Sequence, residues 1–353
     1  MPHWTWLVPA LSLAMLAAGL AVGVGALVGV LCAIALVGAV IAAVHHAEVV
    51  AHRVGEPFGT LVLAVAVTVI EASLILSLML AGGADAAVLP RDTIYAAAMI
   101  ICNGVVGACV LVGGLAHREQ VFRVEGAGAA LAALIAMSAL SLVLPEFTTS
   151  TSGGTYSTAQ LVFAAVTSAA LWAVFVFTQT VSHRDYFIPV GRASDGHAEP
   201  PTNRAAWASF GLLLVSLVTV VGLAKILSPA IERGLATAGA PRAVLGILIA
   251  LLVLAPETMA AVRAARANRL QTSMNLALGS ALASIGLTIP VVAVASIAID
   301  LPLVLGLAPK DLVMLAVTFL VSAVTLGTGR TYMMQGAVHL VLFAAFLFLA
   351  FVP

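Results

Sequence analysis

Long apolar runs recur from one end of this chain to the other, and they constrain its fold more than any other feature. Cutting the 353 residues at their charged and Gly/Pro-rich breaks leaves runs near the roughly 20 residues that a helix needs to cross a bilayer. There are eleven such runs, at residues 6–22, 26–44, 57–82, 93–115, 127–144, 159–181, 206–226, 242–262, 271–298, 311–326 and 331–352. The sequence therefore predicts an all-α polytopic membrane protein with about 11 transmembrane helices.

The composition agrees with lipid as the main surroundings. The chain is 62% hydrophobic and 8% charged, whereas a soluble domain carries roughly 25% charged residues. Its net charge of +0 gives no reason to expect a nucleic-acid partner. The cysteines lie inside apolar runs at spacings that match no thiolate metal site, so no resident metal or other cofactor is expected.

The basic residues predict an orientation, because they are enriched in cytoplasmic loops. If the N-terminus is cytoplasmic, ten arginines lie on the cytoplasmic side and five basic residues lie on the other. This predicts a cytoplasmic N-terminus, a cytoplasmic linker at 182–205 and an outside C-terminus. No basic residue precedes the first run, so we expect that run to stay as a permanent span.

Two acidic residues lie where a membrane span should carry none. Glu71 is at the middle of the apolar run 58–82, and Glu257 is inside the run 243–262, directly after Pro256. A carboxylate at mid-bilayer costs at least about 2.5 kcal/mol. Such residues usually bind an ion or relay protons, although a protonated glutamate that only hydrogen-bonds a neighbouring helix is the plain alternative.

The two glutamates occupy related positions in the two halves of the chain. Glu48 precedes Glu71 in a short charged segment, and Glu232 precedes Glu257 in another. We predict a leading helix at 1–25, a first five-helix repeat at 26–181, the linker at 182–205 and a second five-helix repeat at 206–353. Because five is odd, the second repeat would enter the membrane from the opposite side, which is the inverted arrangement of secondary transporters.

Two segments resemble the signature repeats of the cation/proton exchanger family, within the calcium/cation exchanger superfamily. They are HHAEVVAHRVGEPFGTLVLAVAVTVIEASLILSLML (His45 to Leu80) and APETMAAVRAARANRLQTSMNLALGSALASIGL (Ala255 to Leu287). The family pattern has Gly-Asn-Ala before the acid, a basic stretch and then Gly-Ser. The chain looks most similar to the ChaA-type bacterial antiporters, which exchange sodium or potassium and calcium for protons.

By this resemblance, Glu71 and Glu257 are the ion-binding and proton-coupling glutamates, and Asn103, Ser280 and Thr68 supply further oxygens to the cation. Where the family reads Gly-Asn-Ala, this chain has Val67-Thr68-Val69 and Val253-Leu254-Ala255. The side-chain ligands are therefore fewer than in dedicated calcium exchangers, which leaves the choice among Ca2+, Na+ and K+ open.

The resemblance implies a cation/proton antiporter of the bacterial inner membrane that exports Ca2+ and/or Na+, and K+ as a further candidate, in exchange for H+. Protons and cations would compete for the same carboxylates, and the two loadings would alternate across the membrane. Residues Glu48, Glu232, His45 and His46 are candidates for gating.

A cation channel and an exchanger without proton coupling remain the alternatives. No nucleophile–base motif or metal-ligand motif of an enzyme is found in the sequence. His339, in the last run, fits a packed hydrogen-bonded histidine or a functional group equally well. The sequence leaves the oligomeric state open.

Overall fold

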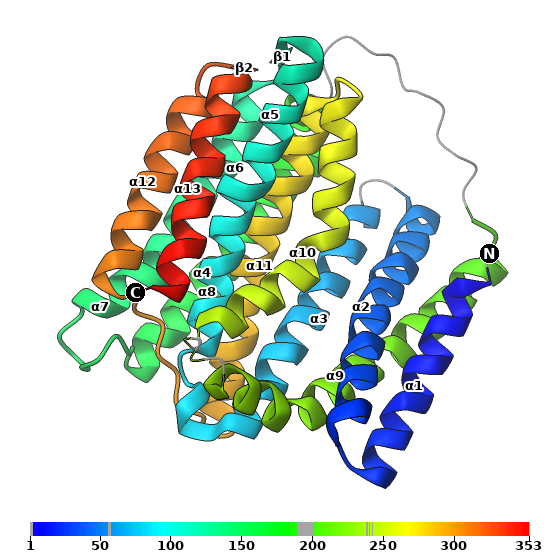
Figure 1. Ribbon diagram of the computed structural model, residues 1–353. Helices are drawn as coiled ribbons and strands as arrows, with labels where there is room; N and C mark the ends of the chain where they lie inside the picture. Colours follow the sequence, from blue (N-terminus) through cyan, green and yellow to red (C-terminus); the bar gives the residue numbers. More distant parts are fainter. Residues whose placement is uncertain are drawn as a thin grey trace. The chain divides into compact units, whose positions relative to one another are not determined.

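The computed structural model describes residues 3–55, 58–188, 201–237, 239, 241 and 243–352, and in them the predicted helical architecture is confirmed. Eleven helical spans in this part of the chain are long and apolar enough to cross a membrane (Figure 1). Two of these spans contain a short π-helical segment between two α-helices, η2 (Ile100–Val105) and η3 (Ala139–Val143), and a further span ends in a third, η4 (Thr178–Ser182).

The elements follow one another in a simple order. They are α1 (Trp4–Val22), α2 (Ala26–Val54), α3 (Phe58–Gly82), η1 (Gly83–Ala86), α4 (Leu89–Met99), η2 (Ile100–Val105), α5 (Val106–His117), β1 (Glu119–Val121), α6 (Val124–Ser138), η3 (Ala139–Val143), α7 (Leu144–Phe147), α8 (Thr158–Phe177), η4 (Thr178–Ser182), η5 (Arg184–Phe187), α9 (Asn203–Thr237), α10 (Ala243–Arg266), α11 (Leu270–Ala298), α12 (Pro309–Leu326), β2 (Arg330–Tyr332) and α13 (Met333–Phe351).

The predicted cut between the first two spans is confirmed. Gly23 ends α1 with φ +83°, a left-handed backbone conformation that suits glycine. Two spans extend well beyond their predicted ends: α2 continues to Val54 and α9 to Thr237. Polar residues mark the end of an apolar run, but histidine and glutamate do not end a helix.

A small antiparallel pair of strands, β1 and β2, departs from the all-α prediction. Glu119 pairs with Tyr332 and Val121 with Arg330, and an ion pair of 3.4 Å joins Arg330 to Glu119. Each strand has three residues. A run that short gives no usable alternation in the sequence.

The chain forms two compact units, Met1–Ala87 with Gly196–Arg242 and Val88–Asp195 with Ala243–Pro353, as far as their residues are described. Each unit takes helices from both halves of the sequence. The units are therefore not the two predicted repeats, whose boundaries stay a prediction.

The first unit contains α1, α2, α3 and α9. His46 near the end of α2 contacts Ser209 near the start of α9, whereas Cys32 near the start of α2 packs with Leu223 and Leu227 further along α9. Helices α2 and α9 therefore run antiparallel.

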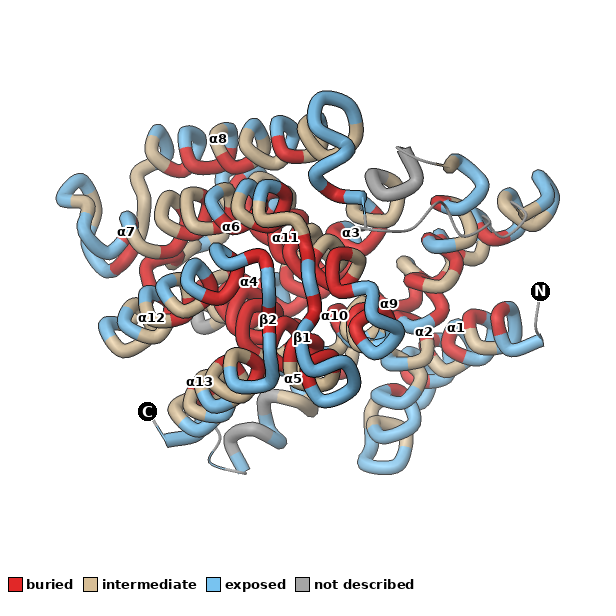
Figure 2. The backbone as a smooth tube through the Cα atoms, turned by 90° about the horizontal axis from the view of Figure 1, so that it is seen from above, coloured by how far each residue is buried: buried red, intermediate tan, exposed pale blue. Residues whose placement is uncertain are grey.

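The second unit surrounds α11, the helix with the longest series of buried residues (Figure 2). Helices α4, α5, α6, α8 and α10 pack against it. Burial of apolar side chains in this unit continues into α12 and α13, which supply Leu315, Leu326 and Phe346 to the same core.

The second unit has two distinct ends. At its β end lie the strand pair, the α10–α11 turn and the start of α11, where the backbone N–H of Arg123 donates to Gln271 over 2.6 Å. At its loop end lie the start of α4, the 148–157 segment and the 299–308 segment, where Gly306 N–H donates to the Gly154 carbonyl and Arg91 donates to the Gly306 carbonyl.

These contacts give the direction of each span in the second unit. The α4–η2–α5 span and α8 run from the loop end to the β end, whereas α11 and α13 run the other way. Likewise α6 runs away from the β end and α12 runs toward it. Together with α2 and α9 in the first unit, four of the five predicted pairs of corresponding spans run antiparallel, as an inverted repeat requires.

Candidate functional site

Glu71 lies in the middle of α3, in the first unit, and only 2% of it is exposed. Thr68 is three residues earlier and 4% exposed. Residues three apart lie on one face of an α-helix. The carboxylate and the hydroxyl are therefore neighbours on a buried face of α3.

The Thr68 hydroxyl has no hydrogen-bond partner in the described part of the chain. Its Oγ1 does not bond back to the preceding turn of the helix. A buried hydroxyl without a partner is costly and calls for an explanation, of which a bound ion is one. This feature fits the predicted role of Thr68 as a cation ligand.

Glu257 lies in α10, in the second unit, and is half-buried. Pro256 has no N–H to donate to the carbonyl one turn earlier, and Thr258 Oγ1 donates to the Leu254 carbonyl over 2.7 Å. Both features disturb the regular backbone hydrogen bonding of α10 at the turn that carries the Glu257 carboxylate. The helix nevertheless stays continuous from Ala243 to Arg266.

Asn103 and Glu257 lie at the same depth in the second unit. Helices α4 and α10 run in the same direction, and a Cβ on Gly246 would stand 2.8 Å from the backbone of Asp92 and 2.9 Å from that of Thr93. Because each residue adds about 1.5 Å along a helix, Glu257 is level with the residues next to Asn103. At the β end His117 Nε2 lies 3.0 Å from the Arg266 carbonyl, so the register of the two helices is kept to within about one turn.

Ser280 is close to the same level. Helix α11 runs opposite to α10, and Ser273 Oγ donates to the Ala261 carbonyl over 2.7 Å. Counting back along both helices places Ser280 within about one turn of Glu257. The second unit therefore brings three of the predicted residues, Asn103, Glu257 and Ser280, to one depth.

The five predicted ion-binding residues are divided between the units. Glu71 and Thr68 belong to the first unit, and Asn103, Glu257 and Ser280 belong to the second. Their common action on one ion stays a prediction.

Asn103 is fully buried in the π-helical segment η2, and polar side chains from two other helices hold its amide. Its Nδ2 donates to Thr318 Oγ1 of α12 over 2.8 Å. Its Oδ1 lies 3.1 Å from Nδ1 of His339 of α13, and Nε2 of that ring lies 3.1 Å from Thr325 Oγ1. π-helical segments are frequent at functional sites.

The sequence interpretation did not find the partners on α12. These partners are Thr318 and Thr325, and with Ser322 between them they repeat at helical spacing and are at most 2% exposed. That spacing is the signal that could have found them, because hydroxyl residues buried along one face of a membrane helix usually bond to neighbouring helices.

The residues predicted to gate the protein differ in their surroundings. His46 is fully buried, with Nε2 2.7 Å from the Thr5 carbonyl and Nδ1 3.2 Å from Ser209 Oγ. Its side chain is therefore held inside the first unit by contacts with α1 and α9. The His45 ring lies 4.9 Å from the Trp4 ring at an interplanar angle of 50°, and Glu48 is exposed. Glu232 is in α9, and its side chain lies outside the described residues.

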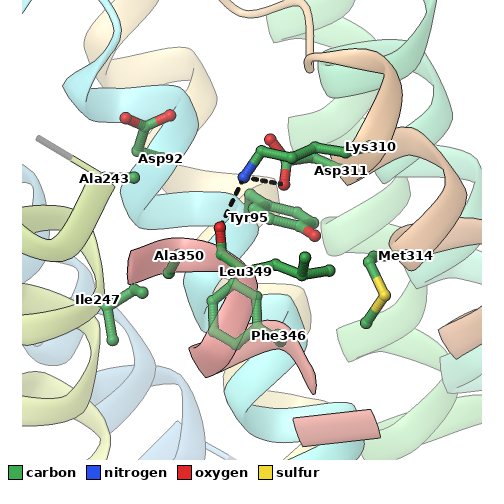
Figure 3. A pocket seen from close by; sticks show the side chains of 10 residues that line it. All are labelled: Asp92, Tyr95, Ala243, Ile247, Lys310, Asp311, Met314, Phe346, Leu349 and Ala350. Atoms are coloured by element: carbon green, nitrogen blue, oxygen red, sulfur yellow. Dashed lines mark hydrogen bonds and ion pairs between the residues drawn. The ribbon is translucent and has the colours of Figure 1, made fainter. Parts of the chain in front are cut away.

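A small pocket lined by both apolar and charged side chains opens at the loop end of the second unit (Figure 3). Its volume of about 30 Å³ gives room for one or two water molecules. Lys310 Nζ donates to the Leu349 carbonyl over 3.0 Å and lies 3.7 Å from the Asp311 carboxylate. The nearby Arg91 forms an ion pair with Asp92, so the charges around this pocket are balanced.

The chain matches the family described as "Sodium/calcium exchanger protein" in two stretches, residues 14–181 and 208–352. The protein y4hA of Sinorhizobium fredii is 47% identical over 356 residues, which cover 100% of this chain and 97% of that protein. The sodium-potassium/proton antiporter ChaA of Escherichia coli is 36% identical over 313 residues, which cover 87% of this chain and 84% of that antiporter.

The fold is similar to that of a crystal structure of the H+/Ca2+ exchanger CAX. The TM-score is 0.75 at 16% identity, and the similarity covers 98% of this chain and 87% of the exchanger.

Proposed function

The chain belongs to the family of sodium/calcium exchanger proteins, and from this premise we propose that it is a secondary active cation/proton antiporter. That it is a multi-pass membrane transporter of the exchanger type follows from the family. The proton as counter-ion is our proposal. It rests on the similarity to an Escherichia coli protein named as a sodium-potassium/proton antiporter and on the two carboxylates within the spans.

The observation that carries the proposal is the pair of glutamates, one in each corresponding span. Glu71 is almost fully buried in α3, the second span of the first predicted repeat, and Glu257 lies in α10, the second span of the second predicted repeat. The antiparallel course of the other four pairs of spans supports an inverted repeat, and so do the two stretches that match the family. In such repeats the two copies of a site face each other near mid-membrane.

We propose that the two carboxylates bind the cation together, with Thr68, Asn103 and Ser280 as further ligands. Two bare charges are costly to carry through the apolar interior. The transporter would therefore change its open side only when protons or a cation neutralise the pair. This rule couples the two fluxes in opposite directions, and an inward proton gradient would then drive the cation out of the cytoplasm.

We propose sodium and potassium ahead of calcium, because the Escherichia coli antiporter that is 36% identical to this chain is named for these two cations. Calcium prefers six to eight oxygens, and Leu254 stands where the family pattern has an asparagine. Asn103 already uses part of its amide to hold Thr318 and His339. The oxygens left for a cation are therefore few.

Everted membrane vesicles of a bacterial strain without its own antiporters test the proposal. An acid-inside proton gradient is imposed, and sodium, potassium or calcium is added while a pH-sensitive dye reports the gradient. We expect sodium and potassium to dissipate the gradient with saturation, and the Glu71→Gln variant to abolish the effect. Saturable cation flux that leaves the gradient intact would indicate an exchanger without proton coupling, and non-saturating flux would indicate a channel.

A further inference from the structure

We propose that His339 is a positioning residue of the cation site: it holds the side-chain amide of Asn103 with its carbonyl oxygen in one fixed orientation. The inference rests on the proposed function, in which Asn103 is a cation ligand. His339 itself is not placed against the ion. It acts through Asn103.

Both the nitrogen and the oxygen of the Asn103 side-chain amide have a hydrogen-bond partner. Asn103 Nδ2 is 2.8 Å from Thr318 Oγ1, and Asn103 Oδ1 is 3.1 Å from His339 Nδ1. All three residues are 0% exposed, so no bulk water competes for these bonds. Thr325 is 2% exposed, and its Oγ1 is the last member of this hydrogen-bonded network, 3.1 Å from His339 Nε2.

With the Asn103 amide oriented so that Nδ2 donates to Thr318, the other donors and acceptors of this hydrogen-bonded network follow. A carbonyl oxygen only accepts, so His339 must carry its proton on Nδ1. In a neutral ring Nε2 is then an acceptor, and Thr325 donates to it. Thr318 accepts from Asn103 and donates onward to Met99 Sδ over 3.5 Å. Every hydrogen bond in this network thus has one donor and one acceptor, and His339 can stay neutral.

The chain leaves Asn103 with capacity for a cation. An amide oxygen has two lone pairs, and His339 uses one of them. If His339 were lost, the amide could rotate by half a turn and exchange its oxygen for its NH2 group. The Asn103 NH2 group would then face the proposed cation position, where an oxygen is needed. That position lies level with Glu257. The histidine therefore keeps an acceptor where a donor would repel the ion.

Close packing of two helices brings His339 to this position. A Cβ on Gly107 of α5 would stand 2.9 Å from His339 Cβ and 3.2 Å from the backbone nitrogen of Leu340. Glycine at this point allows α13 to approach α5 within one side chain's width, as small residues do between membrane helices. The histidine ring then reaches the adjoining π-helical segment.

The test compares three substitutions of His339 by proton-coupled sodium transport, with the half-saturation constant and the maximal rate measured separately. His339→Leu removes the donor, and we expect about five- to tenfold weaker apparent affinity, the size of one lost hydrogen bond. His339→Asn puts an amide N–H near the place of Nδ1 and should keep near-normal affinity. His339→Gln puts its amide near the place of Nε2 and should resemble His339→Leu.

A double-mutant cycle separates positioning from a general loss of packing. Because His339 acts through Asn103, Asn103→Ala with His339→Leu should have the same affinity as Asn103→Ala alone. The matched control is Ser141→Ala, which removes a buried 3.3 Å contact to Ser168 elsewhere in the second unit. We expect it to leave the affinity unchanged. The amount of each variant in the membrane is measured alongside.

The outcomes distinguish the inference from the function on which it rests. A wild-type protein without proton-coupled cation flux would overturn the proposed function. A normal affinity in Asn103→Ala would remove Asn103 from the site. If Asn103→Ala weakens affinity but His339→Leu does not, or if the two effects add, the positioning role of His339 is wrong while the function stands. Failure of His339→Asn to restore the affinity would also overturn the role.

Discussion

The close approach of α5 and α13 makes a measurable prediction at Gly107. Substitution by alanine places a Cβ 2.9 Å from His339 Cβ and 3.2 Å from the backbone of Leu340. Carbon atoms prefer about 3.5–4.0 Å, and neither atom can move without moving α13. Overpacking of this kind costs about 1–3 kcal/mol, whereas removing a glycine from a helix interior gains about 0.5–1 kcal/mol. We expect Gly107→Ala to destabilise the protein by about 1–2 kcal/mol.

Gly128 in α6 supplies the matched control, because a Cβ there would meet nothing within 4 Å. Gly128→Ala should therefore be neutral or stabilising by up to about 1 kcal/mol. Thermal melting of the detergent-solubilised proteins measures both changes against the wild type. A Gly107→Ala protein that melts at or above the wild-type temperature would refute the close packing of α5 on α13 and weaken the account of how His339 reaches Asn103.

Two further predictions concern the coupling and the orientation. The apparent cation affinity should weaken as pH falls, by about tenfold per pH unit for each proton that must leave Glu71 or Glu257, because protons and cations compete for the same oxygens; half-saturation constants measured between about pH 6 and 9 check this, and a pH-independent constant would place proton coupling elsewhere. A reporter that is active only in the cytoplasm should be silent when fused after Pro353, and activity there would remove the odd number of spans.

The number and order of the spans could be predicted because bilayer thickness sets a length that apolar runs must reach. The ends could not. His45, His46 and Glu48 look like a loop in the sequence, yet they continue α2, because a helix may extend past the apolar layer wherever its polar residues find partners. His46 finds them in Thr5 and Ser209.

The glutamates could be predicted because a charge in an apolar run is costly and therefore rarely accidental. The network around Asn103 could not be predicted with the same ease. Asn103 comes from η2, and its partners come from α12 and α13, more than 200 residues later in the sequence. Single threonines or histidines in a span are also compatible with ordinary packing. Only the structure shows that their side chains meet.

The two antiparallel strands were missed for a different reason. Gln120 is buried because its Nε2 donates to the Ala265 carbonyl over 2.9 Å and to Asn268 Oδ1 over 3.0 Å at the end of α10. Strand β1 thus forms where the Gln120 side chain is hydrogen-bonded to the end of α10, the helix that carries Glu257. Such a tertiary contact leaves no periodic pattern in a three-residue segment.

The most direct test of the central claim replaces each glutamate by glutamine, which keeps the shape and removes the titratable charge. If Glu71 and Glu257 form one cation/proton site, each variant should lose proton-coupled sodium and potassium exchange while remaining folded in the membrane, since a neutral amide costs less there than a carboxylate. Glu→Asp at either position should restore exchange with weaker affinity. Near-normal exchange in Glu71→Gln or in Glu257→Gln would contradict the shared site.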